Sequence, residues 1–173
     1  MVAVAAAVVL AGIPADRQVI FPRSIGAFTY YVRGTYRDAV DAFGRPTYRK
    51  TSSAVSCTVG WAGKGLRIYF RSVSRPCRAR SLATAEYSGA TFLSRRWSID
   101  RGLRVGDSWE RMRQLYPLSE QRDMHHKHRW RVRSALSVQP VTRHKRRAFI
   151  DAEFRNRRVV RIDTGYEYGT FTR

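Results

Sequence analysis

The sequence predicts an α+β fold in which two related helix-plus-antiparallel-sheet units stand in tandem, with the helices packed on one face of the sheets. Two short amphipathic stretches each follow a hydroxyl side chain that can cap a helix, and they repeat at one constant offset. Alternating segments of strand type follow both stretches. We therefore expect two units, residues 25–97 and 98–168, preceded by a leader at 1–15 and a linker at 16–24 and followed by a tail at 169–173.

The first unit is expected to begin with a strand over residues 28–32, FTYYV, followed by a helix that Thr35 caps. Asp38 stands at the third helical position, where its carboxylate can reach back to the cap and favours the positive end of the helix dipole. Gly44 and Pro46 end the helix. Its apolar stripe consists of Tyr36, Ala39, Val40 and Phe43.

The second unit contains a similar signal within residues 101–117, RGLRVGDSWERMRQLYP. A short strand through Leu103 and Val105 leads to a turn and then to a helix that Ser108 caps and Pro117 stops. Its buried face is predicted to consist of Trp109, Met112, Leu115 and Tyr116. The constant offset that pairs Thr35 with Ser108 also pairs Phe43 with Tyr116, which indicates an internal repeat.

Strand patterns follow both helices. In the first unit they cover 55–61, 66–70 and a stretch near 83–87, and in the second unit 130–138, 148–154 and 159–164, with Asn156 and Arg157 as the tight connection between the last two. Trp130, Val132 and Ser134 share one predicted face, while Arg131 and Arg133 share the other, as in a sheet with one solvated face. The last strands carry carboxylates surrounded by arginines, at Asp151, Glu153 and Asp163. Paired carboxylates are conceivable there, and ion pairing is the simpler interpretation.

Composition indicates a globular chain with an unusually basic surface. Of the 173 residues, 43% are hydrophobic, enough to fill a core, and 33 Lys plus Arg against 13 Asp plus Glu leave a formal net charge of +20. Residues 1–15, MVAVAAAVVLAGIPA, form a run of small apolar residues too short for a membrane span. We expect it to be the remnant of an export signal, although it lacks a basic start; a buried strand or helix is the alternative.

The two cysteines, Cys57 and Cys77, agree with export. A disulfide between them would close a twenty-residue loop and contribute about 3 kcal/mol by loss of chain entropy in the unfolded state. A redox pair would normally be separated by two residues at a helix start, and a zinc site needs further ligands nearby. We therefore expect a disulfide.

The order of strand, capped helix, Gly-x-Pro, cysteine-bearing hairpin and second GLRVGDS-type helix entry resembles a family. It is similar to secreted actinobacterial tandem-repeat proteins of the kind of beta-lactamase inhibitory protein and the SmpA/OmlA-like domains. The residues that carry the resemblance are Gly34, Thr35, Ala39, Phe43, Gly44 and Pro46 in the first unit and the run 102–108 in the second. The resemblance implies a non-catalytic chain that binds another protein through its open sheet face and loops.

Motifs for metal binding and catalysis are weak. His125, His126 and His128 are candidate metal ligands because imidazole suits zinc, copper and nickel, but their basic surroundings oppose a divalent cation and favour an exposed turn. Ser108 is explained as a cap, and the GxSxG nucleophile pattern is absent from the sequence. We therefore expect no cofactor, no metal site and no enzymatic activity.

The function predicted from these observations is that of an exported, monomeric binding module for an extracellular or envelope protein. Its contact surface is assigned to Trp61, Tyr69, Trp130, Arg131 and Arg133. The alternative is a cationic protein held by charge on a polyanion, that is, a cell-wall polymer, an anionic lipid surface or nucleic acid. An interface of packed side chains should survive high salt, whereas retention by charge should not.

Overall fold

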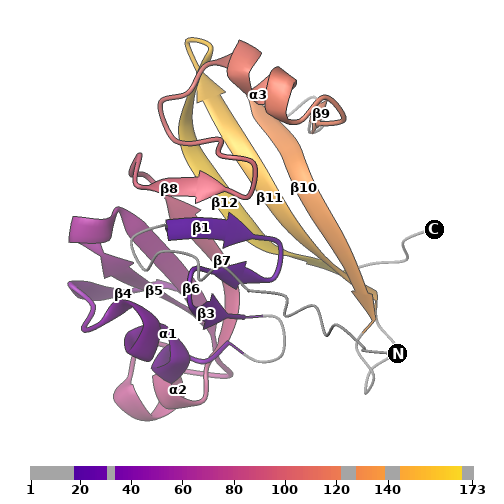
Figure 1. The fold of residues 1–173 in the computed structure, drawn as a ribbon. Coiled ribbons are helices and arrows are strands. Elements are labelled where there is room, and N and C mark those ends of the chain that lie inside the picture. Colours follow the sequence, from indigo (N-terminus) through magenta and orange to yellow (C-terminus); the bar gives the residue numbers. More distant parts are fainter. Residues whose placement is uncertain (1–17, 31–33, 122–127, 139–144, 169–173) are drawn as a thin grey trace, which may run out of the picture.

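The computed structural model describes residues 18–30, 34–121, 128–138 and 145–168. This part of the chain is mostly β-sheet, with 50% of the described residues in strands and 18% in helices. The strands form one sheet of eight and one of four (Figure 1). The predicted α+β class, with helices covering the sheets, is therefore wrong.

The larger sheet contains the strands that follow the two capped helices. These are β4 (Tyr48–Ser53), β5 (Ser56–Trp61), β6 (Leu66–Arg71), β7 (Glu86–Phe92), β9 (Glu120–Gln121), β10 (Arg129–Val138), β11 (Lys145–Arg155) and β12 (Arg158–Tyr168). Their spatial order is β4-β5-β6-β7-β12-β11-β10-β9, and every neighbouring pair is antiparallel. The strands predicted at 55–61, 66–70, 130–138, 148–154 and 159–164 are confirmed. The stretch predicted near 83–87 overlaps β7 only at its last two residues, and β4 was not predicted.

The two halves of this sheet join where β7 pairs with β12. Gly89 lies opposite Gly165 there, and Thr91 lies opposite Asp163. Residues 25–97 supply β4 to β7 and residues 98–168 supply β9 to β12, so backbone hydrogen bonds make one continuous sheet from both stretches.

The smaller sheet is built from short strands that precede and follow the first half. It consists of β1 (Gln18–Phe21), β2 (Ser24–Ile25), β3 (Phe28–Thr29) and β8 (Trp97–Ile99), in the order β3-β2-β1-β8. β1 and β8 are parallel although they lie far apart in sequence. β1 and β2 fall within or at the end of the stretch expected to be a linker, and β3 is shorter than the strand expected at 28–32, of which 31–32 lie outside the described residues.

The helices are short: α1 (Tyr36–Phe43), α2 (Ala79–Ala83), α3 (Trp109–Leu115) and the 3₁₀ turn η1 (Ala62–Lys64). The two predicted caps are confirmed. The Thr35 hydroxyl accepts from the backbone N–H of Asp38, whose carboxylate accepts from the Thr35 N–H at 2.9 Å. The Ser108 hydroxyl accepts from the backbone N–H of Arg111 at 3.2 Å. α2 and η1 were not predicted.

Each capping residue also marks where its helix meets the large sheet. Thr35 forms an isolated bridge with Glu86, the first residue of β7, and Ser108 forms one with Arg158, the first residue of β12. Figure 1 shows α1 and α2 near the first half of the large sheet and α3 near the far end of β10 to β12. The constant sequence offset therefore corresponds to a repeated local connection.

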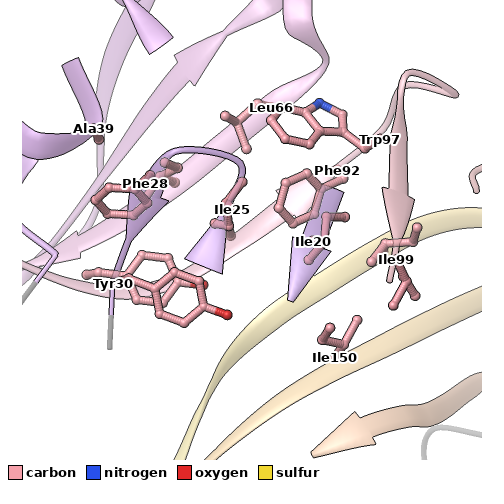
Figure 2. Close-up of a cluster of buried hydrophobic side chains, with 14 of the residues drawn as sticks. Ile20, Ile25, Phe28, Tyr30, Ala39, Leu66, Phe92, Trp97, Ile99 and Ile150 are labelled. Carbon is pink, nitrogen blue, oxygen red and sulfur yellow. The ribbon is translucent and has the colours of Figure 1, made fainter. Parts of the chain in front are cut away.

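Part of the core lies between the two sheets, a layer that the predicted fold class lacks. Figure 2 shows Ile20, Ile25 and Ile99 of the small sheet beside Phe92 and Ile150 of the large sheet, and all five are 0% exposed. A sheet face can be covered by another sheet as well as by helices. The strands that provide this cover are two to four residues long, too short for their alternation to be recognised in the sequence.

The predicted disulfide is confirmed between Cys57 of β5 and Cys77 before α2. The two sulfur atoms are 2.03 Å apart and the Cα atoms 5.1 Å apart. Cys57 is 0% exposed and belongs to the core, so the bond ties the segment before α2 to the sheet.

Candidate functional site

The larger sheet has one face in the core and one face, here called the open face, whose described side chains lie outside the core cluster. Neighbouring strands place Arg67, Thr91, Asp163, Asp151 and Arg131 in one row across this face. Because side chains alternate along a strand, every second residue of each strand shares the face. The open face therefore carries Lys50, Thr58, Tyr69, Arg129, Phe149, Glu153, Arg161 and Glu167 besides that row.

Glycine lies directly opposite an aromatic residue at three positions of the open face: Tyr48–Gly60, Tyr69–Gly89 and Phe149–Gly165. A Cβ atom added to Gly165 would lie 3.0 Å from Cζ of Phe149, and one added to Gly60 would meet the Tyr48 ring. At Gly60 and Gly165 the aromatic ring thus occupies the space that a side chain opposite it would need. This arrangement fixes the rings against the sheet and compensates for the missing glycine side chains.

The arginine beside Phe149 is buried in an ion-pair network. Arg131 is 8% exposed, and its Nε atom donates to Asp151 at 2.5 Å while its Nη2 atom donates to Glu167 at 2.7 Å. The guanidinium also lies over the Phe149 ring, with Cζ 4.4 Å from the ring centroid. Burial alone would lower the pKa of Arg131, but the hydrogen bonds to Glu167 and Asp151 offset it and leave that pKa above its ordinary value.

Asp163 is the centre of a second network on the neighbouring strands. It is 8% exposed and accepts from the hydroxyl of Thr91 at 2.6 Å, from Nε of Arg161 at 2.8 Å and from Arg129. Arg161 also pairs with Glu153 at 2.6 Å. Ion pairing between the carboxylates and arginines of the last strands, the simpler interpretation of the sequence, is confirmed.

A shallow depression of about 300 Å³ lies over the junction of the two halves. Gly89 and Gly165 form part of its floor, and the rings of Tyr69 and Phe149 lie on its two sides. Tyr69 is held by a 2.9 Å hydrogen bond between its hydroxyl and that of Thr91. The depression exists because two glycines meet in register at the centre of the sheet.

Over β4 to β6 the open face carries exposed basic side chains instead of arginine–carboxylate ion pairs. Lys50 and Arg67 are exposed, and neither forms an ion pair with a residue in the described part of the chain. The open face therefore changes from exposed cations over β4 to β6 to bound arginines and carboxylates over β10 to β12.

The residues predicted for partner contact are distributed over both faces. Tyr69 and Arg131 lie on the open face, whereas Trp61 is 3% exposed in the core and donates its indole N–H to Gly44 at 2.8 Å. Trp130 is half-buried against Trp109 on the opposite face of the sheet. For Arg133 the structure describes only the backbone position in β10.

The candidate metal ligands are not brought together in the part of the chain that the structure describes. His128 is exposed before β10, and His125 and His126 lie outside the described residues. The described residues contain no group of three or more His, Cys, Asp or Glu side chains arranged to hold a metal ion.

Sequence reasoning missed Phe149, Gly89 and Gly165 as parts of one site. The sequence contains the glycines and the aromatic residue, but only the strand register shows that they lie opposite one another. Glu167 was also missed, although it continues the alternation of Asp163 along β12.

Comparisons with known proteins found no matching family model, no matching curated protein and no matching solved structure. The resemblance to beta-lactamase inhibitory protein and SmpA/OmlA-like domains therefore stays a prediction. Among the described helices, none combines the length and apolar character needed to cross a membrane.

Proposed function

We propose that the chain is an exported, monomeric, non-catalytic module that binds a partner protein of the extracellular space or cell envelope through the open face of its large sheet. The observation that carries this proposal is the fixed arrangement of arginine and aromatic side chains on a face that the core does not use. Arginine and tyrosine are among the residue types that contribute most to protein interfaces.

Fixed side chains reduce the entropy lost on association. Arg131 is held by two carboxylates and by the Phe149 ring, and Tyr69 is held by Thr91. A partner that meets these groups needs to order few additional rotamers, so more of the contact energy appears as affinity.

The ion pairs on β10 to β12 favour a protein partner over a polyanion on this face. Arg129, Arg131 and Arg161 already donate to carboxylates. A polyanion would have to compete with those carboxylates and would meet their negative charge. The exposed cations Lys50 and Arg67 at the other side of the face suit a protein surface with complementary acidic residues.

Two further observations support the rest of the proposal. A disulfide persists in oxidising compartments, which fits export. The carboxylates Asp151, Glu153, Asp163 and Glu167 each contact an arginine, and this supports an ion-pairing role rather than a role as a general acid or base.

The test is capture of partners by the oxidised full chain from extracellular and envelope proteins of its source, at low and high salt. A single protein retained at high salt is then purified and titrated against the wild type, Arg67→Glu and Arg37→Glu. Both residues are exposed and both substitutions change the charge equally, but Arg67 lies on the open face and Arg37 lies on α1. We expect Arg67→Glu alone to weaken binding.

Two results would contradict the proposal. One is retention of polyanions alone, all released by salt. The other is equal loss of affinity in the two variants, which would assign binding to net charge rather than to the open face.

A further inference from the structure

A second candidate site lies on the opposite face of the large sheet, where α3 meets the β11–β12 turn. A pocket of about 190 Å³ opens there, lined by Trp109, His128, Trp130, Phe154, Asn156 and Arg157. Pockets for whole drug-sized ligands usually measure roughly 300–1,000 Å³. The smaller volume suits one ring of a longer ligand.

The two tryptophans of this pocket differ from the tryptophans of the core. Trp61 and Trp97 are buried, and each donates its indole N–H to a main-chain carbonyl oxygen, at 2.8 and 2.7 Å. Trp109 and Trp130 are half-buried, and neither indole N–H donates to a residue in the described ranges. As far as the described residues go, these two indole donors can therefore hydrogen-bond to a ligand.

The rings are packed as a unit and lie beside cations. The centroids of Trp109 and Trp130 are 4.3 Å apart at an interplanar angle of 69°, and the Phe154 ring lies 5.5 Å from Trp109. Arg113, one turn along α3 from Trp109, places its guanidinium 5.8 and 5.7 Å from the two indole centroids. His128 is exposed at the pocket rim.

The β11–β12 turn adds further positive charge next to the rings. Asn156 and Arg157 adopt the left-handed conformation, with φ of 49° and 59°, and the exposed residues Arg155 and Arg158 flank them. The Arg157 side chain is 75% exposed and pairs with Glu110, which is 53% exposed. An ion pair so exposed contributes little stability, so a phosphate can replace Glu110 as the partner of Arg157.

We propose that this pocket and turn bind single-stranded nucleic acid, with one base against Trp109 and Trp130 and the adjoining phosphates on the arginines of the turn. Single-strand binding combines stacking on aromatic rings with a cationic track for the backbone, and both elements are adjacent here. The indole N–H groups of Trp109 and Trp130 can donate to the acceptor edge of an unpaired base. A paired base could not enter the pocket, so the pocket cannot contribute to the binding of a duplex.

This site is independent of the proposed function because it lies on the other face of the sheet. Trp130 and Arg131 are consecutive in β10 and point to opposite faces. Loss of one activity would therefore leave the other intact.

The experiment is a fluorescence-anisotropy titration of the oxidised full chain with a labelled oligothymidylate. An abasic strand of the same length and a duplex of the same length are the matched ligands. We expect the oligothymidylate to bind on the order of tenfold more tightly than the abasic strand, which has the same phosphates but no bases to stack. The duplex carries twice the phosphates of the abasic strand but no unpaired base, so its binding should depend on salt and should be unchanged in Trp130→Phe.

Variants locate the site. Arg157→Asn keeps a residue that tolerates the left-handed conformation, and Trp130→Phe keeps a ring but removes the indole N–H. The control Arg37→Gln removes one exposed charge from α1. We expect Arg157→Asn to weaken oligothymidylate binding severalfold. Trp130→Phe should reduce the difference in affinity between the oligothymidylate and the abasic strand. Arg37→Gln should have neither effect.

Equal affinity for the oligothymidylate and the abasic strand would overturn the proposal, because the interaction would then depend on charge alone. Equal losses in Arg157→Asn and Arg37→Gln would also overturn it. The comparison of the two ligands and the comparison of the two arginine variants do not use Trp130→Phe, so both remain decisive if that variant fails to fold.

Discussion

Replacement of Arg131 by methionine tests the buried ion pairs of the open face. Methionine retains an unbranched apolar chain but removes the guanidinium that Asp151 and Glu167 accept from. The Asp151 side chain is 3% exposed and would remain as a buried carboxylate without this arginine. The Glu167 side chain is 27% exposed, so water can hydrate its carboxylate. The destabilisation should therefore come mainly from Asp151.

The expected magnitude follows from that burial. Removing one partner of a buried ion pair costs about 3–5 kcal/mol, because the remaining charge stays desolvated. Loss of the cation over the Phe149 ring adds about 0.5–1 kcal/mol. With a urea m-value of about 2 kcal/mol/M, the unfolding midpoint of Arg131→Met should fall by roughly 2–3 M.

The assay is urea unfolding followed by circular dichroism, with Arg157→Met as the matched control. Arg157 and Glu110 also form an arginine–carboxylate pair, but their side chains are 75% and 53% exposed. Breaking this exposed pair should change the free energy of unfolding far less than breaking the buried pair, because water already screens both charges. The double variant Arg131→Met, Asp151→Asn also removes the buried negative charge that faced Arg131 and should recover part of the loss.

Equal destabilisation by Arg131→Met and Arg157→Met would refute the reasoning, because burial would then make no difference to the pair. Failure of Asp151→Asn to recover any stability in the Arg131→Met background would show that lost packing, rather than the buried charge of Asp151, is responsible.

Three other predictions concern the stability of the fold. Thr35→Ala should lower the free energy of unfolding by about 1 kcal/mol because α1 loses its cap, and Thr35→Ser should restore it in the same urea assay. Reduction of the Cys57–Cys77 disulfide should cost about 3 kcal/mol, and dithiothreitol should have no such effect on a variant with both cysteines replaced by serine. Burial raises the pKa values of Tyr30 and Tyr87 above their ordinary value, so both stay protonated in the folded chain while unfolded tyrosines ionise near pH 10. Stability should therefore fall as pH rises above about 10, and absorbance at 295 nm should show these two tyrosines ionising only together with the loss of circular dichroism.

Local interactions explain which features could be predicted. The caps of α1 and α3 depend on a hydroxyl and the three residues after it, so Thr35 and Ser108 could be identified without tertiary structure. Long alternating segments such as β10 and β12 were predicted for a similar reason. The disulfide was expected from the number of cysteines and the inferred compartment.

The parts that failed depend on contacts between distant residues. β1 and β8 are four and three residues long and become a sheet only by pairing across most of the first half of the chain. Because no local pattern marks such short strands, the cover of the large sheet was assigned to helices.

The candidate site shows the same division. The alternation of Arg131 with Trp130 predicted that the two side chains occupy opposite faces, and the structure agrees. Which glycine meets which ring could not be predicted, because a shift of one residue in register would move every side chain of a strand to the other face.

By itself, the sequence determined the capped helices, the main strands, the disulfide and the ion pairing of the last strands, since these depend on neighbouring residues or on composition. Only the tertiary structure decided that a second sheet covers the first, that Gly89 meets Gly165, and that Trp109 and Trp130 form one pocket. The physical reason is that strand pairing and register are set by burial of the whole sheet face, which no single segment determines.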